Sequence, residues 1–274
     1  MFHWEVPYYL LTLCLCLGGA FLHQYRRHTS TSQKPWGFFL SLLGMVLLVS
    51  SPLHAMGREA LFLVRMSETL LLVYILPLLA IQALPQGALT HYWRHERFRK
   101  YSFAIRDLTW NAVIFNSLFF LWHFPWLYNL SLHSAFFDEL QMFGFWVLGV
   151  FMWFPLMTRF SPMRFGTPRR LFYLVTLVLG QVPLFAFLTF THEVFYTGYA
   201  DATRIIPLSA LTDQQMSGWL LKLVTSLIFA SVFIVIVVDW NRDQRQQDKD
   251  ENAQAIENFD LVKRALKKEP PRNG

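Results

Sequence analysis

Seven apolar stretches, each close to 20 residues long, recur along this chain and constrain its fold more than any other feature. A hydrocarbon core of about 30 Å is crossed by about 20 apolar helical residues, and a segment in lipid has to satisfy its own backbone hydrogen bonds. The stretches are Tyr8–Leu22, Trp36–Leu53, Leu61–Leu84, Leu108–Tyr128, Phe136–Leu156, Leu171–Phe190 and Ser217–Val238. The sequence therefore predicts an all-α membrane protein, a bundle of seven transmembrane helices.

Positive charge alternates with these stretches. Most of the 24 Lys and Arg residues lie in the C-terminal tail or in the connections after the first, third and fifth stretches. The first of these connections holds Arg26, Arg27 and Lys34, the second holds Arg94, Arg97, Arg99, Lys100 and Arg106, and the third holds Arg159, Arg164, Arg169 and Arg170. The opposite connections hold only Arg58 and Arg204. Because cytoplasmic loops collect Lys and Arg, we expect the N-terminus outside the cell and the C-terminus in the cytoplasm.

Composition indicates the same class of protein. The chain is 54% hydrophobic and 15% charged, which is too apolar for a soluble protein of 274 residues. The net charge of +6 comes from the basic residues of the cytoplasmic loops, which anionic lipid at that face would attract. We therefore expect the lipid bilayer as a partner and no nucleic acid.

The sequence divides into two parts. Residues 1–240 form the predicted seven-helix transmembrane domain, and residues 241–274 form a charged cytoplasmic tail. Ile256, Phe259, Val262 and Leu266 recur at helical spacing in the tail, before Pro270. Two forms stay open for the tail: an amphipathic helix that continues the last span, and a solvated, frayed chain.

Charged residues that do not belong in lipid gather toward the predicted outer side, at the ends of several stretches. This charged outer cluster comprises Arg65, Glu68, Asp138, Glu139, Asp213 and Lys222. Glu68 follows Arg65 by three residues and so shares its helical face. The cluster is either a structural set of ion pairs, with cations that reach the interface, or a site for a substrate, ion or metal.

Histidine and methionine side chains gather on the same side. Imidazole and thioether ligands suit copper, and thioethers favour the cuprous ion. The candidate metal ligands are His123, Met66, Met142 and Met216, within a wider set that includes His54, Met56, His133 and His192. Copper is therefore the cofactor or cargo that this side of the protein could hold.

Five segments, in order, resemble a known family. They read SPLHAMGREALFLVRMSETLLLVYILPLLA from Ser51, WHFPWLY from Trp122, FMWFPLM from Phe151, FYTGYAD from Phe195 and LTDQQMSGWLLKL from Leu211. Together they are similar to the polytopic CtaG proteins, assembly factors of caa-type cytochrome c oxidases in Bacillus and its relatives. The resemblance implies a multi-pass protein of the bacterial cell membrane, with cytochrome c oxidase subunits as partners.

The chain departs from the family pattern at the residues that would bind copper. Where the family has His before Met in the third span, this chain has Arg65 before Met66, and Thr69 replaces a downstream His or Met. Asp138 and Met142 stand where some members carry histidines. The resemblance thus leaves Met66 and His123 as ligands, beside a fixed positive charge that would repel a copper ion.

We expect an assembly factor of a haem-copper oxidase, for which two mechanisms stay open, beside a third interpretation of the chain as a transporter. It could handle copper at the outer face through His123 and Met66 with Met142 or Met216. It could be a metal-free scaffold that docks an oxidase subunit. It could also be a small-solute or proton-coupled transporter built around Arg65 and Lys222. We expect no enzymatic activity, because no nucleophile, base and orienting group occur at matched spacing.

Overall fold

The computed structural model describes residues 3–28, 35–84, 107–157, 165–200 and 205–268, with residues 91, 93–101, 105 and 202 between these ranges. Lys34, Arg106, Arg159, Arg164, Arg204 and Pro270, on which sequence arguments rested, lie outside the described residues. The described chain contains helices and no strand, which confirms the all-α prediction.

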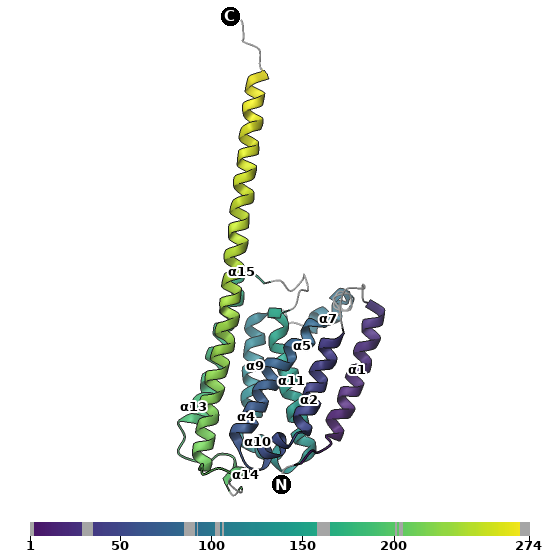
Figure 1. The fold of residues 1–274 in the computed structure, drawn as a ribbon, viewed down its shortest axis with the longest axis vertical. Helices are drawn as coiled ribbons and strands as arrows, with labels where there is room; N and C mark the ends of the chain where they lie inside the picture. The colour runs from purple at the N-terminus through teal and green to yellow at the C-terminus, as the bar shows by residue number, and fades with distance from the viewer. Residues whose placement is uncertain are drawn as a thin grey trace, which may run out of the picture. The chain divides into compact units, whose positions relative to one another are not determined.

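Every predicted apolar stretch falls on one or more helices (Figure 1). Among the described residues, four helical segments are long and apolar enough to cross a membrane: Phe62–Gln82, Ala135–Met157, Thr167–Thr189 and Ala210–Ile256. A bent pair, α2 (Trp36–Ser50) and α3 (Pro52–Glu59), gives a fifth. Helix α1 (Tyr8–His28) and the 15-residue α9 (Leu108–Trp122) do not meet both requirements. The count of seven spans therefore stays a prediction.

Prolines break three of the predicted stretches into two helices. Pro52 begins α3 after a bend of 56° from α2, and Pro125 begins α10 (Pro125–His133) after α9. Gln181 separates α12 (Thr167–Gly180) from α13 (Val182–Thr189), where a proline is again among the first residues. Proline has no backbone N–H and is preorganised for the first helical turn, so each proline starts a new helix.

The third stretch contains a π-helical turn. It consists of α4 (Phe62–Leu70), the π-helix η1 (Leu71–Ile75) and α5 (Leu76–Gln82). Gly149 of α11 (Ala135–Met157) lies against this turn, where an added Cβ would stand only 2.3 Å from the carbonyl oxygen of Val73. Only glycine lets the two backbones approach this closely.

Helix α11 lies at the centre of the bundle. It packs against α1, α5, α9 and α10, while α2 packs on α5 and α9 on α12 (Figure 1). Large side chains such as Phe145 and Trp153 of α11 are fully buried there. Many exposed leucines and phenylalanines lie on the outer faces of the helices, as expected for a surface in contact with lipid.

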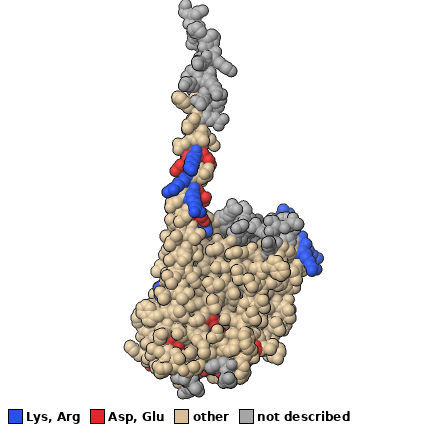
Figure 2. Space-filling view, viewed as in Figure 1, with Lys and Arg blue, Asp and Glu red and all other residues tan. Residues whose placement is uncertain are grey.

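The two ends of this bundle differ in charge. Short helices α3, α10 and α14 (Thr197–Ala200) lie at one end, and α7 (Glu96–Tyr101) lies at the other (Figure 1). Exposed Arg26 and Arg27 lie in the last turn of α1, on the side of α7, where Figure 2 shows blue side chains. Acidic side chains appear toward the opposite end in the same view. The exposed basic side chains at the end of α1 and the acidic side chains seen in this view thus lie toward opposite ends of the bundle.

The chain forms two compact units, Met1–Phe229 and Ala230–Gly274. Helix α15 (Ala210–Lys268) runs through both. In the second unit, Ile256 and Phe259 have exposed side chains. The predicted domain boundary after residue 240 stays a prediction.

Candidate functional site

A buried ionic cluster lies at the end of the bundle that holds α3. Arg65 of α4, whose side chain is 0% exposed, pairs with Asp138 of α11, and its guanidinium also donates to Gln141 Oε1 at 3.0 Å. Glu68 Oε2 lies 3.9 Å from Arg65 Nη1. Two sequence-predicted members, Glu68 and Asp138, are thus brought to Arg65, which does not extend toward the surface.

His54 of α3 completes this cluster. Its Nε2 lies 2.9 Å from Asp138 Oδ2 and its Nδ1 lies 3.2 Å from Glu68 Oε2. Arg65 Nη1 also lies 3.2 Å from Nδ1. An imidazolium would donate to both carboxylates, whereas a neutral ring would donate from Nε2 and accept from Arg65. Sequence reasoning placed His54 among the metal candidates and missed this role, because only the bend after α2 brings it to α4.

Arg58, on the same short helix, marks the solvent-facing edge of the cluster. Its Nη1 lies 3.8 Å from Asp138 Oδ2, and its side chain is 25% exposed. Asp138 therefore faces two guanidinium groups and one imidazole. The buried charges of Arg65 and Asp138 are thus paired within the chain, while Arg65 Nε and Glu68 Oε1 have no hydrogen-bond partner among the described residues.

The other predicted acidic members have different roles. Glu139 Oε2 accepts a hydrogen bond from the backbone N–H of Leu10, in the first turn of α1, at 2.6 Å. Asp213 of α15 accepts from the N–H groups of Phe62 and Leu63, at 2.8 and 2.9 Å. Unpaired N–H groups and the helix dipole favour an anion at a helix N-terminus. These carboxylates cap helices that lie far from them in sequence.

Lys222 stands apart from the ionic cluster. It is half-buried on α15, and no ion pair with a carboxylate is found for it among the described residues. Among the residues that the structure describes, Arg65 is thus the one buried Lys or Arg side chain, and the transporter alternative stays a prediction.

His123, between α9 and α10, is buried with an open nitrogen. Its Nδ1 lies 2.8 Å from the carbonyl oxygen of Phe119 and donates to it, so that Nε2 carries the lone pair. Nε2 has no hydrogen-bond partner among the described residues. The ring packs among Phe119, Tyr128 and Phe145, with centroid distances of 4.6, 5.9 and 5.3 Å.

The three candidate methionines differ in their environment. Met66 and Met142 are both 0% exposed, whereas Met216 is 43% exposed. Met216 shares its exposed face of α15 with Trp219 and Leu223, three and seven residues further on. Met216 therefore presents its thioether on the outside of α15, unlike the two buried methionines, and its role as a ligand stays a prediction.

The described residues hold no group of three or more His, Cys, Asp or Glu side chains that could bind a metal ion. Copper would therefore depend on His123 with thioether ligands. The fixed Nδ1 bond and the free Nε2 of His123 fit such a role, because a ligating imidazole usually donates its other N–H to a carbonyl or carboxylate.

Two tyrosines of the FYTGYAD segment connect these parts. Tyr196 donates from its hydroxyl to the carbonyl oxygen of His123 at 2.8 Å, and Tyr199 donates to that of Gly57 in α3 at 2.6 Å. Burial raises the pKa of Tyr199 well above its usual range, so the hydroxyl stays protonated and able to donate. Both rings contact Phe62 at the start of α4. Sequence reasoning noted the segment but gave these tyrosines no role.

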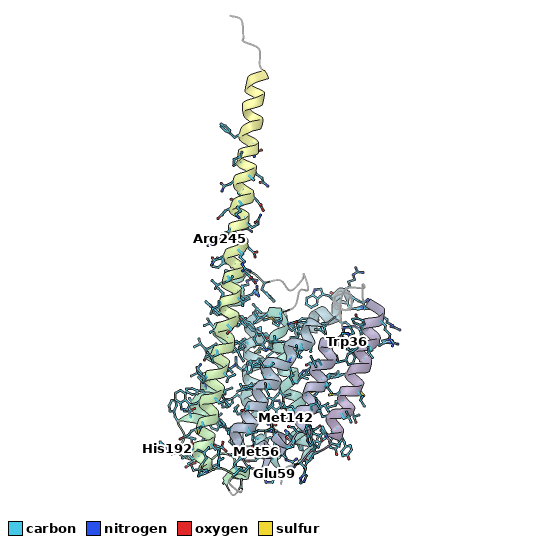
Figure 3. The ribbon with its side chains drawn as sticks, viewed as in Figure 1. Trp36, Met56, Glu59, Met142, His192 and Arg245 are labelled. Atoms are coloured by element: carbon cyan, nitrogen blue, oxygen red, sulfur yellow. The ribbon has the colours of Figure 1, made fainter. Side chains whose placement is uncertain are left out.

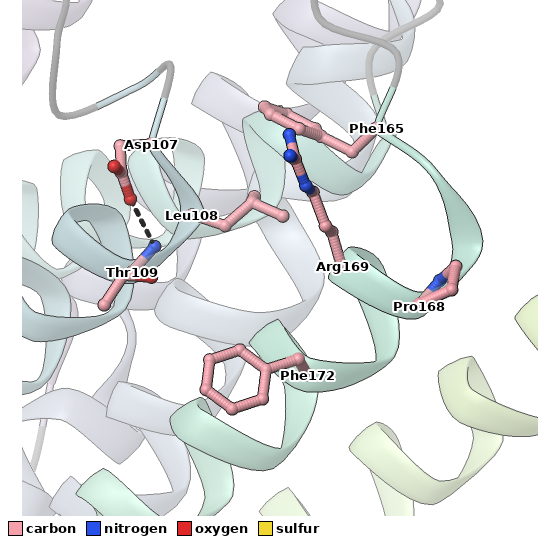
Figure 4. A pocket seen from close by; sticks show the side chains of 7 residues that line it. All are labelled: Asp107, Leu108, Thr109, Phe165, Pro168, Arg169 and Phe172. Carbon is pink, nitrogen blue, oxygen red and sulfur yellow. Dashed lines mark hydrogen bonds between the residues drawn. The ribbon is translucent and has the colours of Figure 1, made fainter.

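Side chains labelled in Figure 3 locate this region in the first unit. Met56, Glu59 and His192 lie at the end that holds α3 and α14, whereas Trp36 lies toward the opposite end. A pocket of about 480 Å³ at that opposite end is lined by residues that include Asp107, Phe165 and Arg169 (Figure 4). Asp107 there accepts a hydrogen bond from the N–H of Thr109 at 2.8 Å and caps α9.

Comparisons with known proteins agree with the resemblance of the five sequence segments. Searches of curated proteins and of solved structures gave no match to the chain. A family model described as cytochrome c oxidase caa3 assembly factor (Caa3_CtaG) matches residues 19–243, which include α2 to α13 and the first part of α15. The chain therefore belongs to the Caa3_CtaG family of cytochrome c oxidase assembly factors.

Proposed function

We propose that this protein assists assembly of a haem-copper oxidase in the bacterial cell membrane by handling cuprous copper at its outer face. In this proposal seven spans cross the bilayer, and the end with the ionic cluster faces outward. The open Nε2 of fully buried His123 is the observation that carries the proposal. Copper is the cargo, and oxidase subunits are the partners.

The chemistry of the available donors supports a cuprous ion. Met66 and Met142 supply soft thioethers that are shielded from water, and His123 supplies a neutral imidazole with a fixed tautomer. Thioether and imidazole ligands suit Cu(I) and need no reduced thiol. Arg65 would repel a cation, but its buried pair with Asp138 offsets that charge.

Copper titration of purified protein tests this proposal. Wild-type protein should bind about one cuprous ion in competition with a chelator. His123→Ala and the pair Met66→Leu/Met142→Leu should each abolish binding without loss of helix content. Met216→Leu is the matched control, because it removes a thioether from the exposed face of α15, and it should leave binding unchanged. Loss of binding in the control, or retention in His123→Ala, would refute the assignment.

A metal-free scaffold is the second candidate function. It is favoured by the ionic cluster, in which Arg65 pairs with Asp138 and His54 bonds to the same carboxylate. In this case the outer end, with Arg58 at its edge, would dock an oxidase subunit. Wild-type protein that binds no copper but still co-purifies with an oxidase subunit would support the scaffold and exclude copper handling.

A further inference from the structure

A groove runs between α1 and α2 on the outside of the bundle. Its volume is about 450 Å³, and its lining is apolar, with Leu11, Leu15, Gly19 and Leu22 from α1 and Phe39 and Val46 from α2. A Cβ added at Gly19 would meet nothing within 4 Å. The absent side chain at Gly19 therefore leaves open space that none of the described residues fills.

The dimensions of this groove indicate which apolar group could occupy it. The residues from Leu11 to Leu22 span about 16 Å of helix at 1.5 Å per residue. The groove is open on one side, and its lining is apolar along this length. Its length and its lining match an extended hydrocarbon chain.

Positive charge continues the lining of this groove at one end. At 100° per residue, Leu11, Leu15, Gly19, Leu22 and Arg26 all fall within an arc of about 80° on α1. Arg26 is exposed and lies one turn beyond Leu22, at the end of the helix.

An interfacial aromatic residue marks the same level on α2. Trp36 is exposed at the first position of α2, three residues before Phe39 of the groove (Figure 3). Tryptophan side chains collect at the headgroup level of a bilayer, and basic residues there attract anionic headgroups.

We propose that this groove binds one anionic phospholipid, with an acyl chain along α1 and α2 and the phosphate at Arg26. The site is independent of copper binding, and it lies on the side that the charge pattern assigns to the cytoplasm. An anionic headgroup and a hydrocarbon chain together match what the two parts of the groove offer.

Native mass spectrometry in detergent tests this proposal. Phosphatidylglycerol and phosphatidylcholine with identical acyl chains are titrated separately, and the fraction of protein that carries one lipid gives each affinity. Wild-type protein should bind phosphatidylglycerol more tightly. Arg26→Gln should weaken the affinity for phosphatidylglycerol by about fivefold, since one basic residue near an anionic surface contributes about that factor. The affinity for phosphatidylcholine should stay unchanged. Arg169→Gln removes the same charge from another helix, and equal weakening by this control would overturn the proposal.

Filling the groove tests the acyl chain separately. Gly19→Leu should reduce the affinity for both lipids, because its side chain occupies the open space. If this variant loses helix content, Gly19→Ala replaces it and should give a smaller reduction in the same direction. Unchanged binding in a folded Gly19 variant would overturn the proposal. A Gly19 variant that loses a co-purifying membrane protein but still binds both lipids would also overturn the proposal. That result would identify the groove as a docking site for a partner helix.

Discussion

Replacement of Arg65 by leucine should destabilise the protein strongly, because it leaves the carboxylate of Asp138 buried without its main partner. Asp138 is 2% exposed, and Arg65 also donates to Gln141. Removal of one partner from a buried ion pair costs about 3–5 kcal/mol. His54 Nε2, at 2.9 Å, and Arg58, at 3.8 Å, remain beside Asp138, so we expect about 3 kcal/mol, the lower end of this range.

Thermal unfolding in detergent, followed by circular dichroism, measures this effect. A change of 1 kcal/mol shifts the midpoint of a domain of about 150–250 residues by about 2–4 °C, so Arg65→Leu should lower it by about 6–12 °C. Arg58→Leu is the matched control, because it removes the same group at a 25% exposed position near the same carboxylate. Partly exposed pairs contribute less than about 1 kcal/mol, so this control should shift the midpoint by less than about 4 °C.

A double variant separates a stranded charge from lost packing. Arg65→Leu/Asp138→Leu removes both charges, and it should be more stable than Arg65→Leu alone, because no carboxylate is left unpaired. An Arg65→Leu midpoint equal to that of wild type, or equal to that of Arg58→Leu, would refute the reasoning about the ion pair. Additive effects in the double variant would show that the two residues do not interact.

Three further predictions follow from the fold. Gly149→Ala should lower the thermal midpoint by the equivalent of about 1–3 kcal/mol, since its Cβ would overlap a backbone carbonyl of η1. Gly19→Ala, with open space around its Cβ, should not lower the midpoint. Equal midpoints of the two variants would contradict this packing. Asp213→Ala should cost about 1–2 kcal/mol by removing the cap of α4, and an unchanged midpoint would show that water replaces the carboxylate. Reporters inserted at Leu130–Ala135 should report the outside and those after Trp240 the cytoplasm, and the reverse result would overturn the orientation.

Hydropathy predicted where the helices lie but not where they break. Hydropathy predicts one span over Trp36–Leu53, yet the chain bends by 56° after Ser50. Ser51 and Pro52 there cap and start α3, a local signal that a count of apolar residues cannot register. The same signal at Pro125 divides the fourth stretch.

The ionic cluster was predictable where it depended on one helix and not where it depended on several. The spacing of Arg65 and Glu68 placed them on one face, as observed. His54 joins them only through the bend before α3, and Glu139 turns to α1 because an N-terminus of another helix lies nearby. Such partners are set by tertiary packing, which a single sequence does not encode in its local spacing.

The caps supplied by Glu139 and Asp213 set an order for biogenesis in the membrane. Leu10 and Glu139 are 129 residues apart, and Phe62 and Asp213 are 151 apart. As the chain leaves the ribosome, the first turn of α1 waits for α11 to be synthesised, and the first turn of α4 waits for α15. Open N–H groups at these helix ends have to be met by water or lipid headgroups until then. Helix α15 therefore completes a helix that began about 150 residues earlier, and a chain that ends before Asp213 lacks the carboxylate that caps α4.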